Sequence, residues 1–446
     1  MNVTKDNIAS IFFQYSIPSV MGMLAISSAN IVDGFFIGNY VGDFGLAAIN
    51  ISLPIFSFLF GFALMLAIGS SVLAGKFIGE ENVKNASLIF SKTIVTITLF
   101  SFLTSSVLFL NIKTLLHFFG ADENLAKIAI EYLSIMLLFI PFLMIGVVLD
   151  YFVRVDNRPN LAFIALLFSA LINVLLDWFM IVYLQKGIFG AALATGISQL
   201  ILLFILLPHF FSKKATLQFV KPIGSYAHIL KAFYNGASEF VNEISIGIMT
   251  LVFNYVMIKN FGMEGIAAFT VINYLLFIGV MISFGISDSL QPIISKNFGA
   301  KEHKRIGAFL KLAFIATSLV GVVMILLLLF VPDTLADIFL EESNDTTKQI
   351  VLSFATYLWI IFLFDGINLV ISAYLTAIHK PLASMVIALS RSLIFPVFFI
   401  VMLPFVFDKN GIFMAIPMAE AVSFIIAMSL FRKFSPQNLG ELNESS

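Results

Sequence analysis

The stretch SSANIVDGFFIGNYVG, residues 27–42, places an acid inside a membrane helix. Apolar residues extend on both sides of Asp33, and the run 8–38 is long enough to cross a bilayer. An Asp at the centre of such a helix costs about 2.5–3.5 kcal/mol, so the side chain usually faces a cavity or a partner. Pro18, earlier in the same run, removes a backbone hydrogen bond and permits a kink. A chargeable group and a hinge therefore share one predicted helix.

The composition indicates a polytopic all-α integral membrane protein. Of the 446 residues, 60% are hydrophobic and 11% are charged, and the mean hydropathy is +1.03. A soluble chain of this length could not carry so much apolar surface. Cysteine is absent, which excludes disulfides and thiolate metal sites, and the net charge of −1 does not suggest nucleic acid as a partner. The N-terminus lacks the features of a signal peptide, so we expect it to be the mature start.

Apolar segments bounded by glycine, proline, asparagine or charge predict twelve transmembrane helices. The predicted spans are 9–38, 47–75, 86–111, 127–151, 161–184, 188–210, 229–259, 266–296, 306–331, 349–378, 383–405 and 411–431. Of the 25 Lys and Arg residues, nineteen fall at the N-terminus, in every second loop and at adjacent helix ends, with Arg391 counted among them. The positive-inside rule therefore predicts that both termini are cytoplasmic.

The two halves of the chain repeat each other. GDFGLAAIN (42–50) corresponds to GMEGIAAFT (262–270), and KFIGEENVK (76–84) to KNFGAKEHK (296–304), both at a shift of 220 residues. Because six helices precede the second copy, both copies have the same orientation in the membrane. Such a parallel repeat favours alternating access around a central cavity. The predicted parts are an N-lobe with helices 1–6 at 1–208, a cytoplasmic linker at 209–228, and a C-lobe with helices 7–12 at 229–446.

Positions that are polar in the first copy and apolar in the second are the main candidates for function. The residues Asp33, Asn173, Asp177 and Thr195 correspond to Phe253, Phe395, Phe399 and Ala419. Residues 173 and 177 are four apart and share a helix face. The set offers two carboxylates, an amide and a hydroxyl, which can hold a hard cation such as Na⁺, or two acids that share a proton. The alternative for Asp177, which precedes Trp178, is a hydrated position at the outer membrane surface.

Further polar residues are candidates of second rank. They are Asn30, Asp150, Glu239, Glu243, Asp288 and Asp365. Acids of the second half that faced a cavity would attract a cationic substrate, but Glu239 alternatively lies near the cytoplasmic end of its helix. Asp150 precedes Arg154 by four residues, and an intrahelical ion pair explains it as well as a role in a site does.

The remaining patterns limit cofactors and partners. The chain has 51 Phe and 17 Met, which suits a cavity for aromatic cations, although most aromatic residues of a membrane protein face lipid or helix seams. No HExxH motif, paired histidines or phosphate-binding loop occurs, so we expect no metal catalysis and no cofactor. The energy source is then an H⁺ or Na⁺ gradient. The predicted partners are small cationic, aromatic molecules and the lipid bilayer, and the protein is expected to be a monomer.

On these residues the chain resembles the multidrug and toxic compound extrusion (MATE) family. The resemblance rests on twelve helices in two lobes, on Pro18 and Asp33, on VRVDNRPNLA (153–162), and on the polar residues of helices 5 and 6, which include GAALATG (190–196). It implies a V-shaped pair of lobes that alternates between outward and inward openings. It also implies export of bulky organic cations driven by protons or sodium.

The same resemblance implies roles for individual residues. It assigns the coupling ion to Asp33, Asn173, Asp177 and Thr195 of the N-lobe, with helix 1 bending near Pro18. Some sodium-coupled members also use acids of helices 7 and 10, where Glu243 and Asp365 lie. The chain departs from the family pattern at Ser238, where a proline would be expected at the start of helix 7.

The function predicted from the sequence is multidrug export by a multi-pass protein of the plasma (inner) membrane. It would exchange organic cations or other amphipathic xenobiotics for H⁺ or Na⁺ by alternating access. A lipid or lipid-linked oligosaccharide flippase of the same superfamily is the first alternative, but it would want a cationic cavity, and the predicted groups at membrane depth are acids. A membrane enzyme would need a clustered catalytic set at one interface, and a channel would not need two lobes. The driving ion and the substrate are left open by the sequence.

Overall fold

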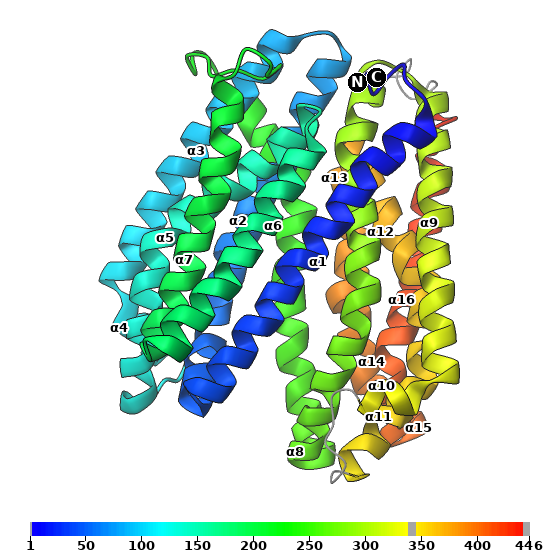
Figure 1. Ribbon diagram of the computed structural model, residues 1–446. Coiled ribbons are helices and arrows are strands. Elements are labelled where there is room, and N and C mark those ends of the chain that lie inside the picture. Colours follow the sequence, from blue (N-terminus) through cyan, green and yellow to red (C-terminus); the bar gives the residue numbers. More distant parts are fainter. Residues whose placement is uncertain (1, 338–344, 440–446) are drawn as a thin grey trace. The chain divides into compact units, whose positions relative to one another are not determined.

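The computed structural model of the protein describes residues 2–337 and 345–439, and helices dominate it (Figure 1). The first half contains α1 (Ile8–Tyr40), α2 (Asp43–Gly79), α3 (Val83–Leu110), α4 (Ile112–Phe118), α5 (Glu123–Val155), α6 (Pro159–Asp177), the π-helical turn η1 (Trp178–Tyr183), α7 (Gly187–Leu206) and the 3₁₀ turn η2 (Leu207–Phe211). The second half contains α8 (Ala227–Gly299), α9 (His303–Phe330), α10 (Pro332–Asp337), α11 (Asp345–Leu358), α12 (Ile361–Ala377), α13 (Pro381–Leu389), the π-helical turn η3 (Ser390–Ile394), α14 (Phe395–Met402), α15 (Pro404–Phe407) and α16 (Lys409–Lys433).

The long helices have the length and the hydropathy of membrane spans. Within the described ranges ten helices qualify, or eleven if α11 and α12, which are bent by 59° relative to each other, count as one span. The 73-residue α8 consists of two helices that meet at Gly262, so these residues are consistent with twelve spans. The bilayer core offers no hydrogen-bonding partners to the backbone, and a helix pairs its backbone N–H and C=O groups internally. The predicted all-helical membrane class is confirmed.

The backbone repeats as the sequence does. Gly42 (φ 88°) precedes α2, and Gly262 (φ 67°) interrupts α8 at the position 220 residues later. Because ψ of Gly262 is −151°, this conformation is open essentially to glycine alone. Two further pairs of left-handed residues recur at nearly the same spacing, Glu81 with Lys301 and Asn157 with His379. The same turns therefore end corresponding helices in both halves.

Contacts divide the chain into two compact units. Unit 1 is Met21–Gly236, and unit 2 combines Asn2–Val20 with the chain from Ala237 onward. Helix α1 thus passes from unit 2 to unit 1 shortly after Pro18, through which it continues without a break. The prediction counted all of helix 1 with the N-lobe, and its lobe and linker boundaries stay a prediction.

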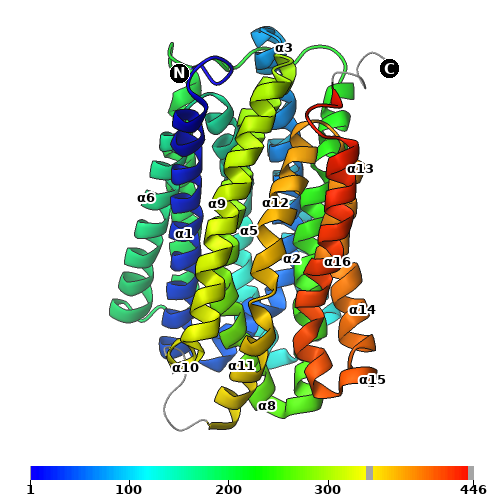
Figure 2. The ribbon, with the colours of Figure 1, turned by 90° about the vertical axis from the view of Figure 1, so that its right-hand side faces the viewer.

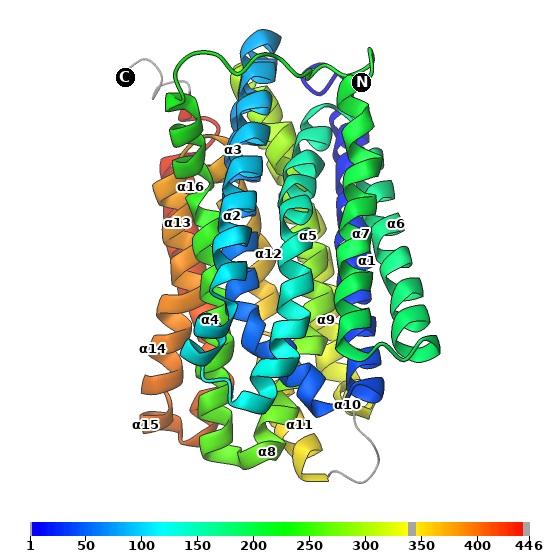
Figure 3. The ribbon, with the colours of Figure 1, turned by 90° about the vertical axis from the view of Figure 1, so that its left-hand side faces the viewer.

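Helix α5 is the central helix of unit 1. It packs against α2, α3, α6 and α7, and the long helices of this unit run side by side (Figure 3). The first turns of α8 pack so closely on α2 that neither contact leaves room for a side chain. A Cβ on Gly69 would lie 1.9 Å from the carbonyl oxygen of Ala232, and one on Gly236 would lie 1.9 Å from that of Met65. Small residues permit such backbone approach between membrane helices.

The segment between η2 and α8 is fastened to unit 1 by hydrogen bonds. The carboxylate of Asp156, at the end of α5, accepts from the backbone N–H groups of Thr216 (2.9 Å) and Leu217 (3.1 Å). The buried Lys92 of α3 donates to the carbonyl oxygen of Ser225 at 2.6 Å. This connection is therefore held along unit 1 at several points of its length.

In unit 2, α12 packs against α9, α13 and α16 (Figure 2). The predicted span 349–378 is interrupted between α11 and α12, and the predicted span 383–405 contains the π-helical turn η3. A similar turn, η1, follows Asp177 in unit 1. Such turns widen a helix locally and are frequent at functional sites. In each unit a charged residue lies at one of them, the buried Asp177 before η1 and the largely buried Arg391 within η3.

Candidate functional site

Unit 1 has a partly open cavity of about 150 Å³ between α1, α5, α6 and α7. Its polar lining residues are Asn30, Asp33, Tyr132, Ser169, Asn173, Thr195, Ser198 and Gln199. Three of the four main candidates therefore lie on one cavity, together with Asn30 from the second rank. Neither lysine nor arginine is among the lining residues, so the charge that the cavity presents is negative.

The fourth main candidate, Asp177, directly contacts the first. The carboxyl groups of Asp33 and Asp177 lie within hydrogen-bonding reach of each other. Asp177 is 0% exposed, so it is not a hydrated residue at the membrane surface. Both of its carboxyl oxygens, and Oδ1 of Asp33, are buried without a hydrogen-bond donor among the described residues. Two such acids cannot both stay ionised cheaply, so the pair needs a proton or a cation.

Helices α6 and α7 hold the rest of the set. Asn173 lies one turn before Asp177, and its Nδ2 is buried without an acceptor among the described residues. Ser169 donates to the carbonyl oxygen of Ser198 at 2.8 Å, and Ser198 donates to that of Thr195 at 2.7 Å. These bonds connect α6 to the segment of α7 that carries Thr195. The hydroxyl and amide groups are thereby presented by two helices that are joined to each other.

Tyr132 on α5 belongs to this site and was missed in the sequence. Its buried ring lines the cavity, and both acids act electrostatically on its hydroxyl. An edge-to-face contact with Phe56, 6.1 Å between ring centroids, holds the ring. A tyrosine inside the predicted span 127–151 was the available signal, because a buried hydroxyl usually has a polar partner.

Asp150 has a structural partner instead of a place on the cavity. Its carboxylate lies 2.6 Å from Arg154, one turn later on α5, and both side chains are buried. The guanidinium of Arg154 also lies 5.3 Å from the ring centroid of Tyr151. The intrahelical ion pair that the sequence offered as an alternative is present.

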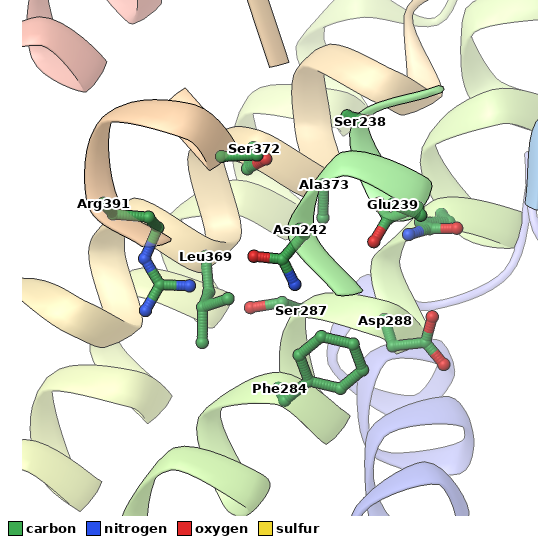
Figure 4. Close-up of a pocket in the computed structure, with 12 residues that line it drawn as sticks. Ser238, Glu239, Asn242, Phe284, Ser287, Asp288, Leu369, Ser372, Ala373 and Arg391 are labelled. Carbon is green, nitrogen blue, oxygen red and sulfur yellow. The ribbon is translucent and has the colours of Figure 1, made fainter. Parts of the chain in front are cut away.

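Unit 2 has a smaller cavity of about 30 Å³ (Figure 4). Its polar lining residues are Ser238, Glu239, Asn242, Ser287, Asp288, Gln291, Ser372 and Arg391. Glu239 and Asp288 lie on this cavity, whereas Glu243 and Asp365, the two acids that the sequence favoured for a cavity position, are not among its lining residues. The C-lobe site stays a prediction. Figure 4 shows the guanidinium of Arg391 approaching this cavity from the side opposite Glu239.

Arg391 corrects one inference from the sequence. Counted as a charge flanking the cytoplasm, it is instead 11% exposed and pairs with Asp365 and, at 2.9 Å, with Glu420. It lies inside the apolar span Pro381–Phe407. The expectation that only acids occupy such positions is therefore wrong. Its place within an apolar helical segment, far from either end, was the signal that could have identified it.

The donor set of unit 1 suits a proton or a hard cation better than a catalytic metal. In residues 2–337 and 345–439 no group of three or more His, Asp or Glu side chains is arranged around a metal position. Two carboxylates, an amide and hydroxyl groups remain, and oxygen atoms of these types bind hard cations. The second copy has apolar residues at the positions that correspond to the four main candidates, so this set is confined to unit 1.

Two repeated helical units of membrane-spanning length, one of them with polar and acidic residues on a cavity, are typical of a membrane transporter. The family model for MatE matches residues 18–179 and 240–402, once in each half. The chain therefore belongs to the MatE family, and it is a multi-pass membrane transporter and not an enzyme.

Similarity to known proteins extends along nearly the whole chain. The protein is 24% identical over 433 residues to the multidrug export protein MepA of Staphylococcus haemolyticus, which covers 95% of this chain and 93% of the relative. Its fold is similar to that of a multidrug resistance MATE family transporter of the MOP superfamily, with a TM-score of 0.92, 20% identity and 98% coverage of both chains. A MOP superfamily transporter from Pyrococcus furiosus, whose binding pocket is described as reversed in polarity, matches with a TM-score of 0.90, 21% identity and 98% coverage of both.

Proposed function

We propose that this protein is a multidrug exporter that exchanges organic cations for H⁺ or Na⁺ at the plasma membrane of a bacterium. The observation that carries the proposal is the contact of two acids, the fully buried Asp177 and the half-buried Asp33, the latter on a cavity without Lys or Arg. A buried pair of this kind changes its charge when it takes up a small cation. The names of the relatives, which are multidrug export proteins, support the choice of cargo.

The mechanism is competition for one charged site. When Asp33 and Asp177 are free of ions, their charge helps to hold a cationic substrate that entered from the cytoplasm. Binding of H⁺ or Na⁺ from outside neutralises the acids, with Asn173 and Thr195 as further oxygen ligands for Na⁺. The substrate then loses its electrostatic partner. Helix α1, which carries both Asp33 and Pro18, bends at the proline and reduces the space that remains.

The gradients supply enough free energy for this cycle. One pH unit across the membrane provides about 1.4 kcal/mol per proton. A potential of about 100 mV adds roughly 2.3 kcal/mol for each net charge moved. An exchange that moves one net charge could therefore sustain accumulation on the order of hundredfold. In this scheme the protein acts as a monomer with both termini in the cytoplasm.

The cavity chemistry favours cations over the anionic cargo of a flippase. A lipid-linked pyrophosphate would require positive groups, whereas the charged lining residue of the unit 1 cavity is Asp33, with Asp177 behind it. Neutral lining groups such as Gln199 and Asn30 add hydrogen-bonding capacity without adding charge. Organic cations with aromatic parts fit this combination.

The test is export of a fluorescent organic cation from vesicles that contain the purified protein. A proton gradient and a sodium gradient are imposed separately, so that the driving ion is identified. Asp33→Asn and Asp177→Asn should each abolish gradient-driven export while the protein stays folded. Glu131→Gln, at an exposed acid of α5 next to Tyr132, is the matched control and should export normally. Normal export by both Asp variants would exclude the proposed scheme.

A further inference from the structure

The segments that lead into α1 and α8 are held by two cations that the antiport scheme does not use. Nζ of Lys92 on α3 donates to the carbonyl oxygen of Ser225 at 2.6 Å. Nη2 of Arg305 on α9 donates to the carbonyl oxygens of Asp6 at 2.7 Å and Val3 at 3.1 Å. We call these bonds the Lys92 clamp and the Arg305 clamp. Each of them fastens the backbone just before a long helix begins.

The two clamps occur at equivalent places in the repeat. Helices α3 (83–110) and α9 (303–330), which carry the cations, correspond at a shift of 220 residues. Ser225 and Asp6 each lie two residues before the start of the helix that follows them. The N-terminal end of a helix carries partial positive charge, so a cation is not the residue that helix capping would place there. Its recurrence in both halves therefore indicates a role other than capping.

Each clamp joins residues of one unit, but the helix that follows it continues into the other unit. Residues 2–20 belong to unit 2 and the rest of α1 to unit 1, whereas α8 leaves unit 1 after Gly236. Arg305 therefore holds the first part of α1 on unit 2, and Lys92 holds the first part of α8 on unit 1. Any change in the relative position of the units has to bend these two helices or release their first parts.

The chemistry of the clamps favours release. The acceptors of both cations are neutral: backbone carbonyl oxygens and, for Nε of Arg305, the amide oxygen of Asn297 at 3.3 Å. Among the described residues neither cation forms a salt bridge. Lys92 is 2% exposed, and a charge that is buried without a counter-charge is unfavourable. Its ammonium group regains hydration when the segment moves away, so water can replace the carbonyl oxygen of Ser225.

We propose that Lys92 and Arg305 are positioning residues of the transport cycle, whose clamps hold the first parts of α8 and α1 in the described conformation and open in another. Opening of a clamp frees the segment before its helix and lets that helix follow the other unit. The role in transport rests on the proposed function, whereas the release of the two segments does not.

Release is measured by alkylation of single cysteines with a water-soluble maleimide, on the protein in nanodiscs. The chain has no cysteine, so each introduced cysteine reports alone. Val3→Cys and Ile229→Cys report on the two segments, because these side chains are only 3% and 2% exposed. The matched controls are Ile387→Cys in unit 2 and Val153→Cys in unit 1, at positions that are 0% exposed. With intact clamps each reporter should react several times faster than its control, and equal rates would overturn the proposal.

Removal of one clamp should accelerate its own reporter alone. Lys92→Met should raise the alkylation rate of Ile229→Cys about tenfold or more, and Arg305→Met should do the same for Val3→Cys. Arg305→Lys keeps the charge and should restore slow alkylation. Methionine retains the apolar stem, so we expect both variants to fold, and glutamine replaces it where one does not. An unchanged reporter, or equal acceleration of reporter and control, would overturn the proposal.

The role in transport is measured with the same variants in the export assay. Lys92→Met and Arg305→Met should slow gradient-driven export several-fold while gel filtration shows folded protein, and Arg305→Lys should restore export. Lys84→Met, at an exposed lysine of α3, is the matched control and should export normally. Unchanged export by variants with released segments would overturn the role in transport. Absence of export by the unchanged protein would overturn the proposed function instead, and the alkylation rates would still decide whether the clamps open.

Discussion

The carboxyl group of Asp33 on α1 lies within hydrogen-bonding reach of that of Asp177 at the end of α6. This contact joins α1, which passes from one unit to the other, to the helix that precedes the π-helical turn η1. A cation or proton shared by the two acids would attract both helices to a common point. Its release would leave two like charges in contact, and repulsion would favour separation. In the proposed function, ion binding and the position of α1 are therefore coupled by electrostatics.

The first prediction concerns the balance between stability and export. Asp177→Asn should raise thermal stability at neutral pH, because it removes a buried acid that lies against Asp33 and whose oxygens have no donor among the described residues, and such an unsatisfied buried group costs about 1–3 kcal/mol. The same variant should lose gradient-driven export. Melting temperature and export are measured on the same preparation. Asp150→Asn is the contrasting variant, because it breaks the ion pair with Arg154 and should lower stability. A destabilised Asp177→Asn protein would contradict the arrangement described for the pair.

Tyr132→Phe should weaken ion binding without affecting folding. The hydroxyl of Tyr132 borders the cavity near both acids, whereas the ring packs against Phe56 and is retained in the variant. A neutral hydrogen bond contributes about 0.5–1.5 kcal/mol, so the concentration of driving ion for half-maximal export should rise about two- to tenfold. The measurement is export as a function of that concentration. An unchanged value would show that the hydroxyl plays no part in ion binding.

The buried pair of Arg391 and Glu420 should give a large coupling energy. Removing Arg391 alone leaves two acids without their positive partner, and breaking a buried pair in this way costs about 3–5 kcal/mol. Removing both partners, in Arg391→Gln/Glu420→Gln, should restore part of that loss. Unfolding of the single and double variants in the same detergent gives the double-mutant cycle. Additive losses would mean that the two side chains do not interact as the distances indicate.

The sequence was sufficient for the fold because the signals are local and repeated. Apolar runs longer than a bilayer is thick define the spans, and the glycine motif at 42 and again at 262 marks the same turn in both halves. The break between α11 and α12 was not predicted, because hydropathy does not change there. Bends depend on packing, which a hydropathy pattern does not contain.

Residues of the candidate site could be predicted where the two halves of the sequence differ. They could not be predicted where the residue type is also common in membrane helices or at their ends. Asp33 and Asn173 stood out because their counterparts are phenylalanines. Tyr132 was missed because tyrosine is common in membrane helices. Arg391 was misassigned because it was counted with the Lys and Arg residues of the cytoplasmic loops and helix ends, which usually mark the cytoplasmic side. Its burial follows from acids on α12 and α16, which are close only after the chain has folded.

Close approach of α2 and the first turns of α8 makes two glycines indispensable. A methyl group on Gly69 or Gly236 would meet a backbone carbonyl oxygen at 1.9 Å, and a backbone atom cannot move aside as a flexible side chain can. Gly69→Ala and Gly236→Ala should therefore each destabilise the folded protein by more than the roughly 1–3 kcal/mol that ordinary overpacking costs. The yield of folded protein should fall accordingly. Gly34→Ala is the control, because its added Cβ meets no described atom within 4 Å. Folded yield is read from gel filtration in detergent, and equal yields for all three variants would contradict this packing.

Asp156 should control the accessibility of the segment between η2 and α8. Its carboxylate accepts two backbone hydrogen bonds from Thr216 and Leu217 and lies 2.5 Å from Nε2 of His209. Hydrogen bonds to a charged group contribute about 1.5–3 kcal/mol each, so Asp156→Ala should release this part of the chain. Trypsin should then cut after Lys213 or Lys214 several times faster than in the unchanged protein. Lys113→Ala, at an exposed residue of α4, should leave the cleavage rate unchanged. Lys92 still donates to the carbonyl oxygen of Ser225 in the variant, so trypsin cleavage after Lys231 should not accelerate. Faster cleavage at all sites would indicate unfolding of the protein instead of local release of this segment.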